Sequence, residues 1–165
     1  MHDLTAMGQA VGALLKERKQ TIAVAESSAG GLISAALLTV PGASAYFVGG
    51  GVIYTLEARR TLLALADEDF TGVLPSSEPY ALRMARAVRG HVGTTWGLAE
   101  TGATGPTGNR YGDAAGHACI AIAGPVEHTL TIETRHSDRE ANMWTFTRAA
   151  LELLETQLKQ EGAGR

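Results

Sequence analysis

The segment Thr21–Ile33 reads TIAVAESSAGGLI, and it decides the fold. Its first residues are apolar or β-branched, which is typical of a buried strand, and its last residues begin an amphipathic helical pattern. Between the two patterns stand a glutamate, two serines, an alanine and two glycines. This order predicts a strand, a tight turn and a helix N-terminus, an arrangement at which α/β proteins place their ligands. A serine on such a turn is also a candidate nucleophile.

Helical and strand patterns alternate on either side of this segment, and a hairpin pattern follows. The sequence predicts helices over 4–15, 28–40, 57–66, 77–88 and from 138 onward, and strands over 21–25, 46–54, 95–100, 117–123 and 128–135. We therefore predict an α/β fold with a single domain over residues 1–165, built as a three-layer α/β/α sandwich with a mixed β-sheet. Residues from about 160 to 165 are expected to form a frayed tail.

The composition narrows the class of protein. The 165 residues carry a formal net charge of −3, so a basic face for nucleic acid is not expected. No apolar run approaches the roughly 20 residues that span a bilayer, and the N-terminus lacks a signal-peptide pattern, so no membrane contact is predicted. Cys119 is the only cysteine and lies in an apolar run, which fits a cytoplasmic protein. The 5 histidines show no ligand spacing, and we predict no metal site and no cofactor.

Glycine is unusually frequent, with 20 residues gathered mainly in clusters. Such clusters are typical of loops in which the backbone approaches a ligand or another chain, although simple turn geometry also produces them. The cluster over 102–108 follows a predicted strand and offers backbone N–H groups and hydroxyls. It lacks the lysine of a P-loop, which excludes an ATPase of that class.

Several motifs, met in order along the chain, resemble those of the CinA C-terminal domain, the nicotinamide-nucleotide amidohydrolase family. Ala25–Gly31 resembles the family's A-E-S-C-T-G-G, Pro41–Ser44 its P-G-S-S, Gly51–Arg59 its G-x-V-x-Y-S-N-E-A-K, Thr101–Pro106 its T-G-I-A-G-P, and Ser137–Arg139 its G-D-R. The resemblance covers nearly the whole chain and implies the same three-layer fold. It also implies an enzyme of NAD recycling that hydrolyses the carboxamide of nicotinamide mononucleotide to nicotinate mononucleotide and ammonia. A homo-oligomer is expected, in a standalone form without the N-terminal domain that some members carry.

The resemblance assigns the nucleophile to Ser27 and the active-site tyrosine to Tyr54. From the turn alone, Ser27 or Ser28 is equally suited to cap the following helix, and with the resemblance Ser28 is expected to be the cap. Tyr54 has an alternative role as a packed aromatic at a strand end. The residues expected to bind the mononucleotide are Ser28, Gly30, Gly31, Gly102, Thr104, Gly105 and Arg139. The alternative for Arg139 is exposure to solvent.

The base is the point at which the chain departs from the family. The family's lysine corresponds to Arg59, which stays charged and cannot accept a proton, and Leu56 stands where the family has asparagine. Glu26 or Glu57 would then serve as base, because burial can raise a carboxylate's pKa toward neutrality. Alternatively, the chain binds a nucleotide without hydrolysing it, or it binds another anion through the Arg59 guanidinium. A further alternative is an interaction module that binds no small ligand. An ordinary solvent-facing arginine is the remaining alternative for Arg59.

Overall fold

A computed structural model describes residues 2–163, and its centre is a mixed β-sheet of five strands in the order β2-β1-β3-β4-β5. The strands are β1 Ile22–Glu26, β2 Phe47–Val52, β3 Trp96–Ala103, β4 His117–Ala123 and β5 Glu127–Glu133. β1 runs parallel to both of its neighbours, whereas β4 pairs antiparallel with β3 and β5. The predicted hairpin is therefore confirmed, and it completes the sheet on the side away from β2.

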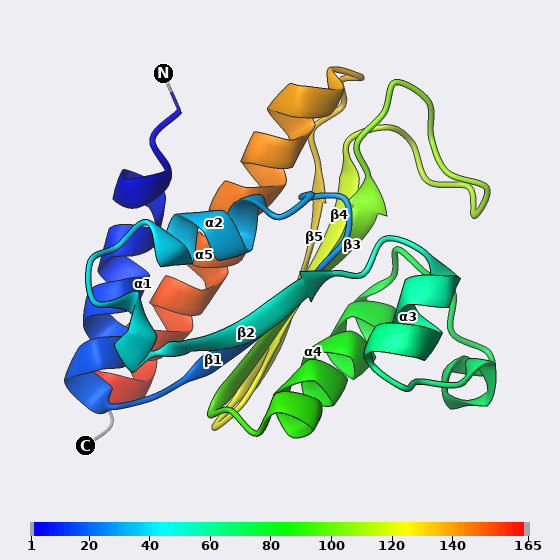
Figure 1. The fold of residues 1–165 in the computed structure, drawn as a ribbon. Helices are drawn as coiled ribbons and strands as arrows, with labels where there is room; N and C mark the ends of the chain where they lie inside the picture. The colour runs from blue at the N-terminus through cyan, green and yellow to red at the C-terminus, as the bar shows by residue number, and fades with distance from the viewer. Residues whose placement is uncertain (1, 164–165) are drawn as a thin grey trace.

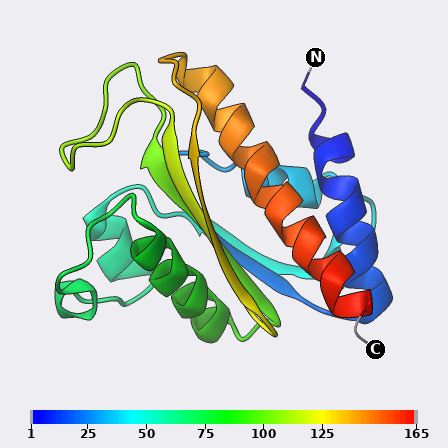
Figure 2. The ribbon, with the colours of Figure 1, turned by 180° about the vertical axis from the view of Figure 1, so that it is seen from behind.

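Helices cover both faces of this sheet. They are α1 Leu4–Arg18, α2 Leu32–Leu38, α3 Leu56–Leu62, α4 Glu78–Val92 and α5 Arg139–Ala163. Figure 1 shows α1, α2 and α5 on one face and α3 and α4 on the other, and the view from behind in Figure 2 agrees. The predicted three-layer sandwich is thus confirmed. Within residues 2–163, no helix combines the length and the apolar character that a membrane crossing requires.

The core consists of two apolar clusters, one on each side of the sheet. Val24 and Leu98 point to the cluster under α1, α2 and α5, whereas Ala23 and Ala99 point to the cluster under α4. This division follows from the alternation of side chains along a strand. Every residue of β1 is buried, which explains its unbroken run of apolar residues before the glutamate. The small alanines face α4 and let that helix lie close to the sheet.

Several boundaries differ from the sequence prediction, and three of them show the physical reason. α2 begins at Leu32 rather than at residue 28, because Gly30 and Gly31 take positive φ values of 69° and 99° and extend the turn. α4 runs past Val88 to Val92 and ends where Gly93 adopts a φ of 80°. Residues 160–163 of the predicted tail are instead part of α5, which continues to Ala163, and the remainder of that tail, 164–165, lies outside the described residues. The Glu161 carboxylate accepts a hydrogen bond from Arg18 at 3.3 Å and ties this end to α1.

Candidate active site

A cavity of about 370 Å³ opens at the carboxyl ends of β1 and β3. At this edge the chain leaves β1 toward α2 on one face and leaves the parallel strand β2 toward α3 and α4 on the other face, so the two connections diverge. Such divergence creates a crevice where α/β proteins bind ligands. The polar residues lining the cavity are Ser27, Tyr54, Thr55, Ser76, Tyr80, Glu100, Thr101, Asn109, Arg110 and Tyr111.

Ser27 occupies the first position of the turn after β1 and lines the cavity. Its backbone N–H donates to Oε2 of Glu100 at 3.1 Å. Its Oγ makes no hydrogen bond with any residue in the described range 2–163. The hydroxyl that the resemblance selects as nucleophile is therefore uncommitted and stands on the cavity wall.

Glu100, at the end of the apolar part of β3, is a site residue that the sequence analysis missed. It is only 2% exposed, and it accepts hydrogen bonds from the N–H groups of Ser27 and Ala29 and from the hydroxyl of Ser28. Burial raises the pKa of Glu100 to about 7, and the charge of Glu26 adds to the rise, although the hydrogen bonds oppose it. A glutamate ending an otherwise apolar strand was the signal available in the sequence.

Glu26 is not available as the base expected from the sequence. It is completely buried, and its carboxylate accepts the N–H groups of Gly31, Ile33 and Ser34 at 2.8, 3.1 and 2.9 Å, together with the Ser34 hydroxyl at 2.8 Å. These are donors that the first turn of a helix leaves unpaired. Glu26 therefore caps α2, the role that we had predicted for Ser28. It does not line the cavity.

Replacing Glu26 by glutamine should lower the free energy of unfolding by about 1–3 kcal/mol, because the amide sets N–H donors against the N–H donors of the helix. Chemical denaturation monitored by circular dichroism measures this change. The matched control is Glu57→Gln, since the Glu57 side chain is 76% exposed and should shift stability by less than about 0.5 kcal/mol. Equal effects of the two substitutions would contradict the capping role. Glu57, the other carboxylate considered as base, does not line the cavity.

Tyr54 and Arg139, 85 residues apart, meet at the rim of the cavity. The Arg139 guanidinium donates to the Tyr54 hydroxyl at 3.0 Å and to the carbonyl of Gly105 at 2.6 Å. Tyr54 is 58% exposed and lines the cavity, so it is not a packed core aromatic. A positive charge is thereby fixed beside a phenol at the cavity mouth.

The remaining predicted binding residues lie at different distances from the cavity. Gly102 lines it. Thr104 and Gly105 do not line it, and their carbonyls accept hydrogen bonds from Asn142 and Arg139, respectively. Ser28, Gly30 and Gly31 shape the turn beside the cavity without lining it.

Arg59 lies outside the cavity. It is 3% exposed, and its guanidinium donates to Asp67 at 2.6 Å and to the Tyr80 hydroxyl at 3.4 Å. The same group stacks 4.1 Å from the centre of the Phe70 ring, which belongs to the 3₁₀ turn η2 Asp67–Phe70. The interpretation of Arg59 as a solvated residue is wrong, because the side chain is buried. Its role as a phosphate ligand stays a prediction, and in this structure its guanidinium contacts the carboxylate of Asp67. The guanidinium contacts side chains of both η2 and α4, and these contacts hold α3 against both elements.

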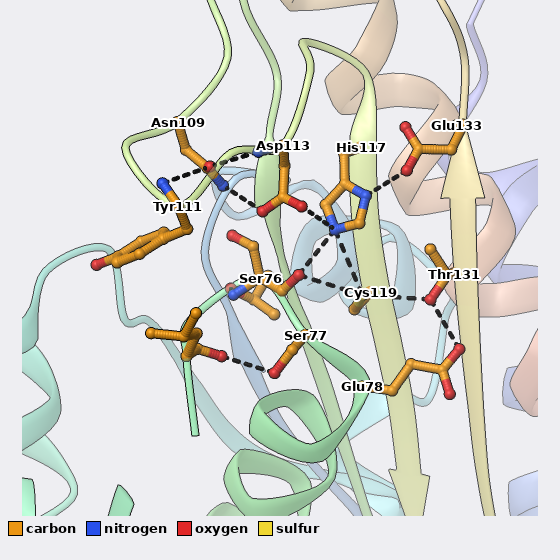
Figure 3. A network of polar contacts seen from close by, with 12 residues as sticks. Ser76, Ser77, Glu78, Asn109, Tyr111, Asp113, His117, Cys119, Thr131 and Glu133 are labelled. Atoms are coloured by element: carbon orange, nitrogen blue, oxygen red, sulfur yellow. Dashed lines mark hydrogen bonds and ion pairs between the residues drawn. The ribbon is translucent and has the colours of Figure 1, made fainter. Parts of the chain in front are cut away.

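A polar network supports the part of the cavity wall that Ser76, Asn109 and Tyr111 form (Figure 3). Nε2 of His117 donates to the carbonyl of Ser76 at 2.7 Å and lies 3.5 Å from an oxygen of Asp113, while Nδ1 hydrogen-bonds with Glu133. Burial by itself would lower the pKa of His117, but these three acidic or carbonyl partners together raise it. The network thus favours a charged histidine that links β4 to the cavity wall.

The loop of residues 109–113 is held by its own hydrogen bonds and by this network. The Asn109 side-chain oxygen accepts the N–H groups of Tyr111 and Asp113 at 3.0 and 3.1 Å, and its amide donates to Asp113 at 2.8 Å. Arg110 and Tyr111 therefore stand in defined positions on the cavity wall. Within residues 2–163, no group of three histidine, cysteine or acidic side chains is arranged to hold a metal ion.

Comparisons with known proteins agree on one family. The family described as the CinA C-terminal domain matches residues 4–158. CinA-like proteins of Gloeobacter violaceus and Desulforapulum autotrophicum are 36% and 37% identical over 159 and 157 residues, covering 94% of this chain in both cases. The chain spans only 37% of the length of each of these relatives.

Solved structures give the same result for the fold. A CinA superfamily protein from Klebsiella pneumoniae is 25% identical with a TM-score of 0.88, and the match covers 96% of this chain and 99% of that one. A competence/damage inducible protein from Agrobacterium tumefaciens is 28% identical with a TM-score of 0.82, covering 96% and 97%. Since both the sequence and the fold match over almost the whole chain, this protein belongs to the CinA C-terminal domain family.

Proposed function

We propose that the chain hydrolyses the carboxamide of nicotinamide mononucleotide, releasing ammonia and nicotinate mononucleotide, with Ser27 as the nucleophile. The observation that carries this proposal is the uncommitted Ser27 hydroxyl on a cavity wall, next to the buried carboxylate of Glu100. Membership of the CinA C-terminal domain family supports it, as does the resemblance of the motifs around Ser27 and Tyr54 to the amidohydrolase family.

The turn after β1 also offers a donor for the oxyanion that an amide forms when a serine attacks it. In hydrolases with a serine on a strand-to-helix turn, the backbone N–H of the next residue stabilises the developing charge. Here that residue is Ser28, whose N–H has no hydrogen-bond partner among residues 2–163. Its neighbours Ser27 and Ala29 direct their N–H groups to Glu100 instead. The Ser28 N–H is therefore the proposed oxyanion donor.

The rim carries charge suited to the phosphate of a mononucleotide. Arg139 lies beside Tyr54, and Arg110 donates to the Tyr111 hydroxyl at 3.0 Å on the loop of residues 109–113. Guanidinium groups bind phosphate through paired N–H donors. In the proposed complex, the pyridine carboxamide lies deep beside Ser27, and the phosphate lies at the mouth between the two arginines.

Replacing Arg139 by alanine should raise the KM for nicotinamide mononucleotide about 10-fold or more while changing kcat less, because the lost contact binds substrate rather than the reacting amide. Steady-state kinetics of ammonia release measures both parameters. Arg148→Ala is the matched control, because Arg148 is an exposed arginine of the same helix away from the cavity. An unchanged KM in the Arg139 variant would show that the phosphate of the substrate does not bind at Arg139.

The direct test of the proposed function is ammonia release by the purified chain. Incubation with nicotinamide mononucleotide should yield equal amounts of ammonia and nicotinate mononucleotide, followed by a coupled assay and by chromatography. Nicotinamide riboside, which lacks the phosphate, should react more slowly. No product above the uncatalysed rate would refute the proposed function.

Binding without turnover is the second candidate function, and the position of Arg59 favours it. The residue that stands in place of the family's lysine is buried against Asp67 and Phe70, outside the cavity. A chain that only binds the nucleotide would show a rise in melting temperature with nicotinamide mononucleotide and no ammonia. That pair of results would replace hydrolysis with binding as the conclusion.

A further inference from the structure

We propose that Glu100 is the general base of this chain, taking the proton from Ser27 Oγ in the role that the family gives to lysine. The inference rests on the proposed function and adds a catalytic residue to it.

The composition of the cavity wall singles out Glu100. The titratable residues that line the cavity are Tyr54, Tyr80, Glu100, Arg110 and Tyr111. Tyrosine and arginine side chains are already protonated at neutral pH and do not accept a further proton there. Within the described residues, neither a lysine nor a histidine lines this cavity. Glu100 is the lining residue that can accept a proton from a hydroxyl near neutral pH.

The carboxylate of Glu100 is also held against the turn that carries Ser27. One oxygen lies 3.1 Å from the N of Ser27 and 2.8 Å from the N of Ala29, and the other accepts the Ser28 hydroxyl. The contacts come from both the N–H groups and a side chain of the turn, so the carboxylate cannot swing away. Ser27 Oγ belongs to the same residue as the first of these N–H groups, so Glu100 is held by the backbone of the residue whose hydroxyl would react.

The surroundings of Glu100 suit repeated proton transfer. The charged groups around Glu100 are Glu26, the last residue of the adjacent strand β1, and Arg110, which lines the same cavity. Burial and the Glu26 charge raise the pKa of Glu100 to about 7. A group with that pKa is present both as base and as acid at neutral pH, which is the condition for efficient general acid–base catalysis.

The proposed reaction needs only water as a further reactant. Glu100 takes the hydroxyl proton as Ser27 Oγ bonds to the amide carbon, and the carbonyl electron pair moves to oxygen. The tetrahedral intermediate re-forms the carbonyl as the carbon–nitrogen bond breaks, and Glu100 returns the proton to the nitrogen, which leaves as ammonia. Water then attacks the acyl-serine, gives its proton to Glu100, and the carboxylic acid forms as Ser27 Oγ leaves and regains a proton.

A purely structural role for Glu100 predicts a different result from a catalytic one. Glutamine keeps an acceptor oxygen for the N–H groups of Ser27 and Ala29, so Glu100→Gln should preserve the turn while removing the base. A structural role would lower the melting temperature and leave the pH dependence of Ser27 unchanged. The matched control is Glu78→Gln, because Glu78 also accepts two hydroxyl hydrogen bonds, from Thr129 and Thr131, but lies off the cavity wall.

The experiment measures the reactivity of Ser27 with phenylmethylsulfonyl fluoride, followed by peptide mass mapping, alongside ammonia release. In the unaltered chain, both rates should rise with pH through a midpoint near 7, as Glu100 ionises. Glu100→Gln should lower both rates about 100-fold and abolish the midpoint. Glu78→Gln should keep both the rate and the midpoint. If the glutamine variant fails to fold, Glu100→Asp keeps a carboxylate and should retain a measurable pH midpoint.

The two readouts separate the failure of this inference from that of the proposed function. Ammonia release that survives Glu100→Gln with its pH profile intact would overturn the general base and leave the hydrolase standing. A Ser27 labelling rate that is flat between pH 5.5 and 8.5 in the unaltered chain would also overturn it. Conversely, Glu100-dependent labelling without ammonia release from nicotinamide mononucleotide would support the base and refute the proposed substrate.

Discussion

Ser27→Ala should reduce ammonia release from nicotinamide mononucleotide to near the uncatalysed rate, a loss of at least about 1,000-fold in kcat. The reason is that the proposed reaction passes through an acyl-serine, and alanine offers no atom to form it. The fold should survive, because Ser27 Oγ makes no hydrogen bond within the described chain and its N–H contact to Glu100 is retained. The melting temperature should therefore remain close to that of the unaltered chain.

The control for this substitution is Ser34→Ala. Ser34 also stands near the start of α2, and its hydroxyl donates to Glu26 at 2.8 Å away from the cavity. This variant should lose a little stability and keep its activity. A contrary result would be full activity in Ser27→Ala together with loss in Ser28→Ala, since the Ser28 hydroxyl bonds directly to Glu100. The nucleophile would then be reassigned by one residue.

Arg59→Ala should lower the free energy of unfolding by about 2–4 kcal/mol, because it removes a buried side chain and leaves a void between Phe70 and Tyr80. Little of this loss comes from the ion pair, since Asp67 is 56% exposed and also pairs with Arg60. Urea denaturation measures the change. A loss below about 0.5 kcal/mol would show that the packing around Arg59 has little energetic weight.

Arg59→Lys examines the same position for catalysis. A lysine there regains the family's residue, but its ammonium cannot stack flat on the Phe70 ring while contacting both Asp67 and Tyr80. We expect an intermediate loss of stability and no gain in ammonia release, because the side chain starts from outside the cavity. A gain of 10-fold or more would mean that a lysine reaches Ser27, and the role of Glu100 would then be shared.

The order and type of the elements could be predicted because they depend on local patterns. The apolar run ending at Glu26 marks β1, and Ser77 caps α4 through a hydrogen bond to the N–H of Tyr80 at 3.3 Å, as its place before Pro79 indicates. The boundaries were less certain, because Gly30 and Gly31 permit several paths and the packing of α2 selects one of them. The end of α5 depends on the contact between Glu161 and Arg18, which no local pattern contains.

The candidate site divides in the same way. Ser27 and Tyr54 could be selected from motifs, since Ser27 directly follows β1 and Tyr54 lies just beyond β2, and both line the cavity. The residues next to Arg59 in the sequence are typical of a surface helix. In the structure, however, Phe70 and Tyr80 from other elements pack against its guanidinium. Glu100 was missed because its partners, the N–H groups of the β1–α2 turn, lie more than 70 residues away.

By itself, the sequence determined the strand–turn–helix at Thr21–Ile33, the mixed sandwich and the place of a serine on the turn, because these follow from hydrophobic periodicity and turn chemistry. Only the tertiary structure decided the roles of Glu26 and Glu100, which follow Ala25 and Ala99, the last residues at which β1 and β3 pair with each other. Glu26 accepts hydrogen bonds from N–H groups at the N-terminus of α2 and caps that helix, whereas Glu100 lines the cavity. The physical reason is that a carboxylate's role depends on the donors and the water around it, and those are supplied by distant parts of the chain.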